Sequence, residues 1–170
     1  MKKIYFSGKF NRLKQKELTL EQSLANDYRA QLLGNPELLT KAQKNLTIGS
    51  QFIYTGPFYC EQASNGEYTS TDCSVVLNEE LKAVQNSDVF IAVFDKSFSV
   101  GTVVELEWAL NQNKKVIILY RPQSSVYQIK SEYWFAIADA LRQNPNTKIY
   151  SYQTSKQMMN LMLKILKEEI

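Results

Sequence analysis

NSDVFIAVFDKSFSVGTVVELEWALNQNKKVIILY, the stretch of residues 86–120, decides the fold of this chain. Two almost continuous apolar segments, residues 88–94 and 115–120, enclose a helical pattern over residues 102–113. Apolar runs without alternation are typical of strands that are buried on both faces, as in a parallel sheet. The stretch therefore predicts a strand, a helix and a second strand of a parallel α/β sheet.

The rest of the chain continues this alternation. Further strands are expected at residues 3–7, 51–55 and 147–152. Helices are expected at residues 18–33, 74–85, 131–143 and 155–170, with one or two helical turns at 37–44 and a long polar loop between Cys60 and Cys73. The sequence thus predicts a single α/β domain, residues 1–170, with a five-stranded, mostly parallel, doubly wound sheet of the Rossmann or flavodoxin-like kind.

The composition excludes several chemistries, because the chain contains no histidine. Ser-His-Asp catalysis, Cys-His catalysis and any metal site built on imidazole are ruled out. The two cysteines are too few for a four-thiolate zinc site. Any catalysis is therefore expected to rely on carboxylates, hydroxyls, lysines or backbone dipoles.

Charge and hydropathy limit the partners of the chain. A net charge of +3 is small and scattered, which does not favour binding to nucleic acid. No apolar run has membrane-spanning length, and the apolar stretch at the N-terminus is too short for a signal peptide. A soluble, cytoplasmic protein is the expectation.

Glu105 is expected in the first turn of the helix that follows the strand at residues 88–94. Ligands of parallel α/β proteins bind at the carboxyl ends of strands, beside helix N-termini. Two interpretations are open. Thr102 and Glu105 have the spacing of a capping box, in which both side chains bind backbone N–H groups. Alternatively, the helix dipole keeps Glu105 ionised and directed at a substrate as a nucleophile.

Ser99, Gly101 and Thr102, in the connection before this helix, are candidates for binding a phosphate at the helix N-terminus. The alternative is an ordinary connection in which the hydroxyl side chains cap the helix. The pattern matches neither G-x-G-x-x-G nor a P-loop, so it does not support a dinucleotide or triphosphate site.

A second candidate group lies at the end of the first strand. Gly8 would let a ligand approach the backbone closely, and Lys9 adds positive charge. Phe10 is placed where it can line a binding site, although a tight turn with solvated charges is the alternative. Within the strand, Tyr5 carries a hydroxyl that can orient a carboxylate on the neighbouring strand–helix junction.

Glu79 and Glu80 form a pair of carboxylates in the middle of the helix predicted at residues 74–85. Such pairs are usually solvated. Glu80, however, lies four residues from both Val76 and Val84, so it borders the apolar face of the helix and can reach the edge of a site.

Several of these motifs together resemble the nucleoside 2-deoxyribosyltransferase superfamily, which includes the 2'-deoxynucleoside 5'-phosphate N-hydrolases. Its pattern has Tyr-x-x-Gly in the first strand, an aspartate at the start of an apolar strand, Gly-Thr-x-x-Glu leading into a helix with an alanine, and a lysine before the next strand. In this chain the corresponding residues are Tyr5 to Gly8, Asp88, Gly101 to Glu105, Ala109 and Lys115.

The resemblance implies that Glu105 is a nucleophile, which attacks the anomeric carbon of a 2'-deoxyribonucleoside or its 5'-monophosphate and displaces the base. A second base or water would then release the deoxyribosyl group with net retention, as in retaining glycosidases. Tyr5 matches the tyrosine that holds the nucleophile. Glu80 occupies the position at which members carry an Asp or Asn that contacts the sugar.

Ser99 stands where several transferases have an Asp thought to protonate the leaving base, and where the nucleotide hydrolases have a Ser that contacts the 5'-phosphate. Lys9 or Arg12 would be further phosphate partners. The resemblance implies no metal, no organic cofactor and a homo-oligomer. The alternatives are a strict 2'-deoxynucleoside 5'-phosphate N-hydrolase and a non-catalytic nucleotide-binding or sensor module on the same fold.

Overall fold

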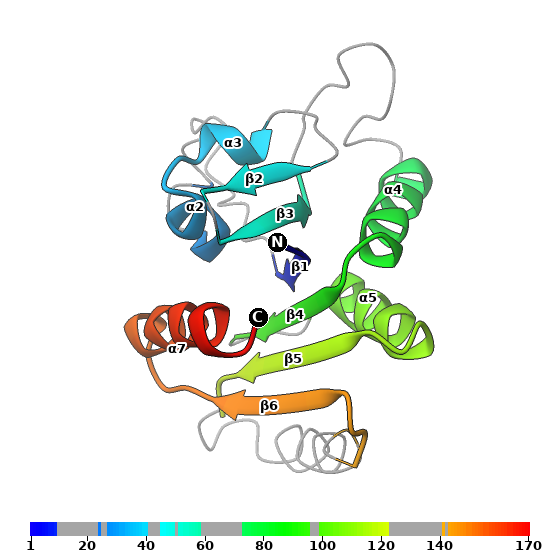
Figure 1. The fold of residues 1–170 in the computed structure, drawn as a ribbon. Helices are drawn as coiled ribbons and strands as arrows, with labels where there is room; N and C mark the ends of the chain where they lie inside the picture. The colour runs from blue at the N-terminus through cyan, green and yellow to red at the C-terminus, as the bar shows by residue number, and fades with distance from the viewer. Residues whose placement is uncertain are drawn as a thin grey trace.

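The computed structural model contains a single sheet with helices on both of its faces (Figure 1). The structure describes residues 1–9, 24, 27–40, 45–49, 51–58, 73–95, 99–122, 141 and 143–170. The predicted α/β class is confirmed.

Within these described residues the sheet has six strands, in the order β2-β3-β1-β4-β5-β6. All neighbouring pairs are parallel except β2 and β3, which are antiparallel. The strands are β1 Lys2–Gly8, β2 Leu46–Ile48, β3 Phe52–Gly56, β4 Val89–Phe94, β5 Lys115–Tyr120 and β6 Thr147–Ser151.

The predicted number of five strands is wrong by one, because the sequence does not reveal β2. A strand of three residues is too short to show the alternation by which strands are recognised. The chain turns back through Gly49, which has a φ of 52°, and the N–H of Gln51 donates to the Ile48 carbonyl at 3.0 Å. The turn places β2 against β3 at the edge of the sheet.

The described helices are distributed over the two faces. Helices α4 (Cys73–Gln85) and α5 (Val100–Asn111) cover one face, and α2 (Tyr28–Leu33) and α7 (Ser155–Glu168) cover the other (Figure 1). The short α3 (Glu37–Thr40) contacts α2. Most of the helices predicted at residues 18–33 and 131–143 lies outside the described residues.

The central strand β4 shows why the apolar runs lack alternation. Its odd-numbered residues pack in the core under α2 and α7, and its even-numbered residues pack in the core under α4 and α5. All six of its residues are buried. A strand between two layers of helices must be apolar on both sides, as the sequence predicts.

The order of the parallel strands determines where a ligand is expected. Strand β1 has β3 on one side and β4 on the other, so the direction in which strands are added reverses between β1 and β4. Without β2, this is the flavodoxin-like order. Ligands of such sheets bind beyond the carboxyl ends of the strands at this point of reversal.

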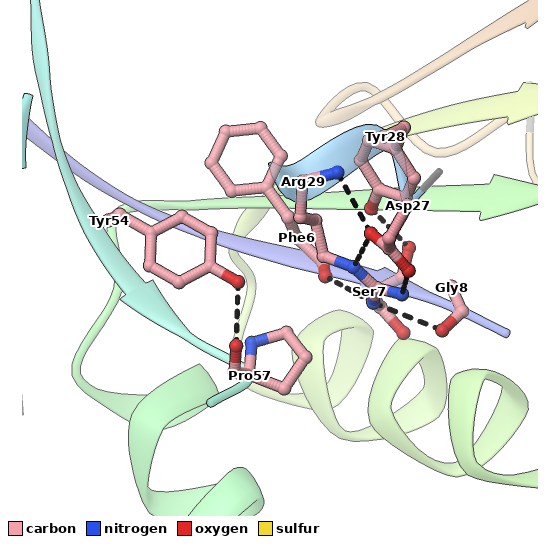
Figure 2. Close-up of polar contacts among 8 residues, drawn as sticks. All are labelled: Phe6, Ser7, Gly8, Asp27, Tyr28, Arg29, Tyr54 and Pro57. Atoms are coloured by element: carbon pink, nitrogen blue, oxygen red, sulfur yellow. Dashed lines mark hydrogen bonds and ion pairs between the residues drawn. The ribbon is translucent and has the colours of Figure 1, made fainter. Parts of the chain in front are cut away.

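The Tyr5 ring of β1 lies at this point of reversal, and Gly56 of β3 packs against it. The ring stacks on Phe90 at a centroid distance of 5.9 Å. Gly56 has a φ of 145°, and a Cβ added to it would lie 3.0 Å from Cε2 of Tyr5. The Tyr54 hydroxyl donates to the Pro57 carbonyl at 2.6 Å and so holds Pro57, the residue after Gly56, in place (Figure 2). Glycine is therefore required beside the Tyr5 ring.

We expect Gly56→Ala to lower the free energy of unfolding by about 3 kcal/mol, because the new methyl group collides with the Tyr5 ring and the backbone is strained. Gly34→Ala is the matched control, since Gly34 also has a positive φ, of 73°, but nothing lies within 4 Å of its added Cβ. The control should lose about 1 kcal/mol. Equal losses in urea denaturation would contradict the proposed contact.

Candidate active site

The carboxylate of Glu105 is bound on both of its oxygens by hydroxyl groups of β1. The Tyr5 hydroxyl donates to Glu105 Oε1 at 2.6 Å, and the Ser7 hydroxyl donates to Glu105 Oε2. Tyr5 and Ser7 are fully buried, and Glu105 is 5% exposed. Side chains two residues apart on a strand point to the same face, so both hydroxyls meet α5. These contacts join residues about 100 positions apart at the point of strand reversal.

The position of Glu105 on α5 differs from the sequence-based expectation. The helix begins at Val100 with Ser99 as its N-cap, two residues before the predicted start. The N–H of Thr102 donates to Ser99 Oγ at 3.5 Å. Glu105 therefore lies beyond the first turn, and its carboxylate binds β1 instead of the helix backbone. The capping-box interpretation is wrong.

Opposing influences act on the charge of Glu105. Burial raises the pKa of its carboxyl above the ordinary value, and this is the largest effect. The hydrogen bonds from Ser7 and Tyr5 and the nearby charge of Arg29 favour the ionised form and lower that pKa. The site thus holds a buried carboxylate that is supported by donors and by a cation.

Glu80 of α4 belongs to the same electrostatic environment. Burial, followed by the negative charge of Glu105, raises the pKa of Glu80 from 4.5 to about 7, and Arg29 acts in the opposite direction. Glu79 beside it is exposed and forms an ion pair with Lys82 at 2.7 Å. The usual solvated role therefore applies to Glu79, whereas Glu80 is half-buried and influenced by Glu105.

Side chains of α2 hold the carboxyl end of β1. The fully buried Arg29 donates from Nη1 to the carbonyls of Gly8 at 3.1 Å and Phe6 at 3.3 Å. The Tyr28 hydroxyl donates to the Ser7 carbonyl at 3.0 Å. Asp27 balances the Arg29 charge through two contacts of 2.7 Å, and Figure 2 shows the whole cluster. Three successive carbonyls at the end of β1 thus accept hydrogen bonds from α2.

Ser7, Tyr28 and Arg29 are site residues that the sequence alone does not reveal. Ser7 could have been predicted, because a hydroxyl two residues after Tyr5 lies on the same face of the strand. Tyr28 and Arg29 gave no such signal, since their partners are backbone carbonyls of a distant strand.

The glycine at the end of β1 has a packing role. A Cβ added to Gly8 would lie 3.2 Å from the Val93 carbonyl oxygen and 3.3 Å from Tyr28 Cε1. Strand β4 and helix α2 therefore both approach this position closely. Lys9 follows as an exposed residue, whereas Phe10 and Arg12 lie outside the described residues.

The residues predicted to bind phosphate gather at the start of α5. Ser99 caps the helix, and Thr102 is buried. The side of Gly101 is open, because an added Cβ would meet nothing closer than Ser99 Oγ at 3.8 Å. Residues 96–98 of this connection are outside the described part of the chain. The phosphate site itself stays a prediction.

Further along the carboxyl edge, Arg121 forms an ion pair with Asp95 at 3.1 Å. Its guanidinium lies 5.5 Å from the ring centroid of Tyr152, whose hydroxyl donates to the Phe94 carbonyl at 3.3 Å. These contacts fasten the ends of β4 and β5 to the segment after β6.

Two further properties follow from the described part of the chain. Its Cys, Asp and Glu side chains include no group of three that could hold a metal ion. None of the helices described there has the length and apolar character needed to cross a membrane.

Comparisons with known proteins show similarity in structure only. No family model matches the chain, and no curated protein matches its sequence. Among solved structures, the Clostridium botulinum CMP N-glycosidase BcmB has 16% sequence identity and a TM-score of 0.51, over 96% of this chain and 98% of that chain. The chain shares its fold with this CMP N-glycosidase. The doubly wound α/β fold predicted from the apolar runs is thus confirmed.

The fold is also found in proteins with other ligands. Aquifex aeolicus Era Y63A, in a structure bound to GDP·AlF4⁻, has 18% identity and a TM-score of 0.51 over 98% of this chain and 57% of that chain. The present sequence has no P-loop, so this second likeness concerns architecture. Because fold does not determine function, the site around Glu105 is the feature that bears on what this protein does.

Proposed function

We propose that this protein cleaves or transfers the N-glycosidic bond of 2'-deoxyribonucleosides or their 5'-monophosphates, with Glu105 as nucleophile. The observation that supports this most is the buried Glu105 carboxylate, which accepts hydrogen bonds from Tyr5 and Ser7 where the strand order reverses. A buried charge is costly unless it is paired, so a carboxylate in this position calls for an explanation beyond helix stability.

The proposed reaction has two displacements. In the first, an oxygen of Glu105 bonds to the anomeric carbon, the bond from this carbon to the base nitrogen breaks, and its electron pair leaves with the base. In the second, water or another base attacks the same carbon and the ester bond to Glu105 breaks, which restores the carboxylate. Tyr5 and Ser7 stabilise the carboxylate as it departs in this second step.

The leaving base needs a proton, and we infer that Glu80 supplies it. Ser99 replaces the Asp of several transferases, and its hydroxyl caps α5. Glu80 is partly protonated near neutral pH, because its pKa is raised to about 7. Once Glu105 is esterified, its charge is lost and the pKa of Glu80 falls. Glu80 can then accept a proton from the attacking water.

A strict 5'-monophosphate N-hydrolase is the second candidate. It is favoured by Ser99, which matches the nucleotide hydrolases, and by the shared fold with an enzyme that is named for its action on CMP. Release of base from nucleosides and from nucleotides, each measured with and without free adenine, separates transfer from hydrolysis. CMP belongs in this series as the ribonucleotide.

For the nucleophile, we expect Glu105→Gln to lower kcat/KM by at least about a thousandfold, because an amide cannot replace the attacking carboxylate. Its free energy of unfolding should fall by no more than about 1 kcal/mol, since glutamine still accepts from Tyr5 and removes a buried charge. Release of free base, followed by chromatography, measures the reaction.

The matched control is Glu107→Gln on the same helix. Glu107 is exposed and accepts a hydrogen bond from Asn111 at 3.1 Å. This variant should keep the parent activity. If Glu105→Gln retained parent activity, or if a catalytically active parent used a carboxylate elsewhere, the proposal would be wrong.

For the proton donor, kcat/KM of the parent should fall as pH rises through the Glu80 pKa of about 7. Glu80→Gln should lower kcat/KM by about a hundredfold and remove this alkaline limb. 7-Methyl-2'-deoxyguanosine, whose base departs without an added proton, should be cleaved nearly as well by the variant. Glu79→Gln should leave the pH profile unchanged, and an alkaline limb that persists in Glu80→Gln would refute the assignment.

A further inference from the structure

We propose that Ser7 is a second positioning residue for the Glu105 carboxylate, and that α2 holds Ser7 in place through Tyr28 and Arg29. The catalytic consequence of this inference rests on the proposed function. The effect on the carboxylate itself does not depend on it.

A carboxylate with one donor keeps the freedom to rotate about its last bond. Tyr5 binds Oε1 and Ser7 binds Oε2, so both oxygens of Glu105 are held from one strand. Charge-assisted hydrogen bonds of this kind stabilise the ionised form and orient it. Ser7 thus adds a constraint that Tyr5 alone cannot supply.

The position of Ser7 depends on support from outside the sheet. Pairing between β1 and β3 ends at Tyr5, which lies opposite Gly56, whereas pairing with β4 continues to Gly8. Residues 6–8 therefore have a neighbouring strand on one side alone. On the side left open, Arg29 donates to the carbonyls of Phe6 and Gly8, on either side of Ser7.

Tyr28 supports Ser7 directly, because its hydroxyl donates to the Ser7 carbonyl at 3.0 Å. Burial raises the pKa of Tyr28, so its hydroxyl stays protonated and remains a donor. Arg29 has a second effect, since its positive charge lowers the pKa of Glu105. The same helix thus fixes the strand and favours the ionised carboxylate that the strand binds.

The test compares Ser7→Ala with the parent in two measurements. ¹³C NMR of labelled glutamate carboxyls follows the titration of Glu105, with Glu105→Gln for assignment, and kcat/KM is measured across pH. Without the Ser7 donor, Glu105 should titrate at higher pH. At the acidic end, kcat/KM should then fall about tenfold relative to its plateau, because one charge-assisted hydrogen bond contributes about that factor.

Ser87→Ala is the matched control, because Ser87 is also a buried serine with one hydroxyl hydrogen bond, to Val84 at 2.6 Å. It lies just before the amino end of β4, whereas the candidate site lies toward the carboxyl ends of the strands. Its loss should change stability without moving the Glu105 titration. Ser7→Cys, which keeps the volume and weakens the donor, should give a smaller shift in the same direction and serves if Ser7→Ala does not fold.

The outcomes separate the two proposals. The positioning role would be overturned if the parent and the Ser7 variants had the same Glu105 titration and the same fall of kcat/KM at acidic pH. A parent that releases no base, combined with a Glu105 titration that moves in Ser7→Ala, would refute the proposed function and support the positioning role. Ser7→Thr keeps the hydroxyl, so a Glu105 titration and a pH dependence of kcat/KM like those of the parent in this variant would support the positioning role further.

Discussion

The structure depends on one buried carboxylate and the two hydroxyls that bind it. Glu105 of α5 joins Tyr5 and Ser7 of β1 in the interior, where a charge without partners would be costly. This contact requires β1 and β4 to be neighbours, because α5 follows β4 directly. The reversal of strand order at the centre of the sheet therefore positions the chemistry as well as the fold.

Other features of the fold support this contact from three directions. Gly56 leaves room for the Tyr5 ring on the β3 side. On the opposite face of the sheet, Arg29 binds the carbonyls of Phe6 and Gly8 where the end of β1 lacks a strand partner, and Tyr28 binds the Ser7 carbonyl between them. On the α4 side, Glu80 provides a second carboxyl whose pKa depends in part on the charge of Glu105. Two carboxyls in one site whose pKa values depend on different surroundings are the usual basis for acid and nucleophile roles.

The sequence predicted the features that depend on local pattern. Apolar runs without alternation gave the central strands, and the resemblance paired Tyr5 with Glu105 correctly in space. The short β2 had no pattern to detect, and the start of α5 was misplaced because Ser99, not Thr102, provides the cap. Arg29 could not be predicted, since its partners are backbone carbonyls whose need for donors arises only where β3 ends.

The central claim, that Glu105 forms a covalent bond with the sugar, is tested most directly by intact-protein and peptide mass spectrometry after incubation with a 2-fluoro-2-deoxy nucleoside. Fluorine slows release of the sugar by disfavouring the oxocarbenium-like transition state, so an intermediate should accumulate. The account predicts one added fluorodeoxyribosyl group on the peptide that carries Glu105, absent in Glu105→Gln. Release of the base with no adduct, or with an adduct on another residue, would contradict it.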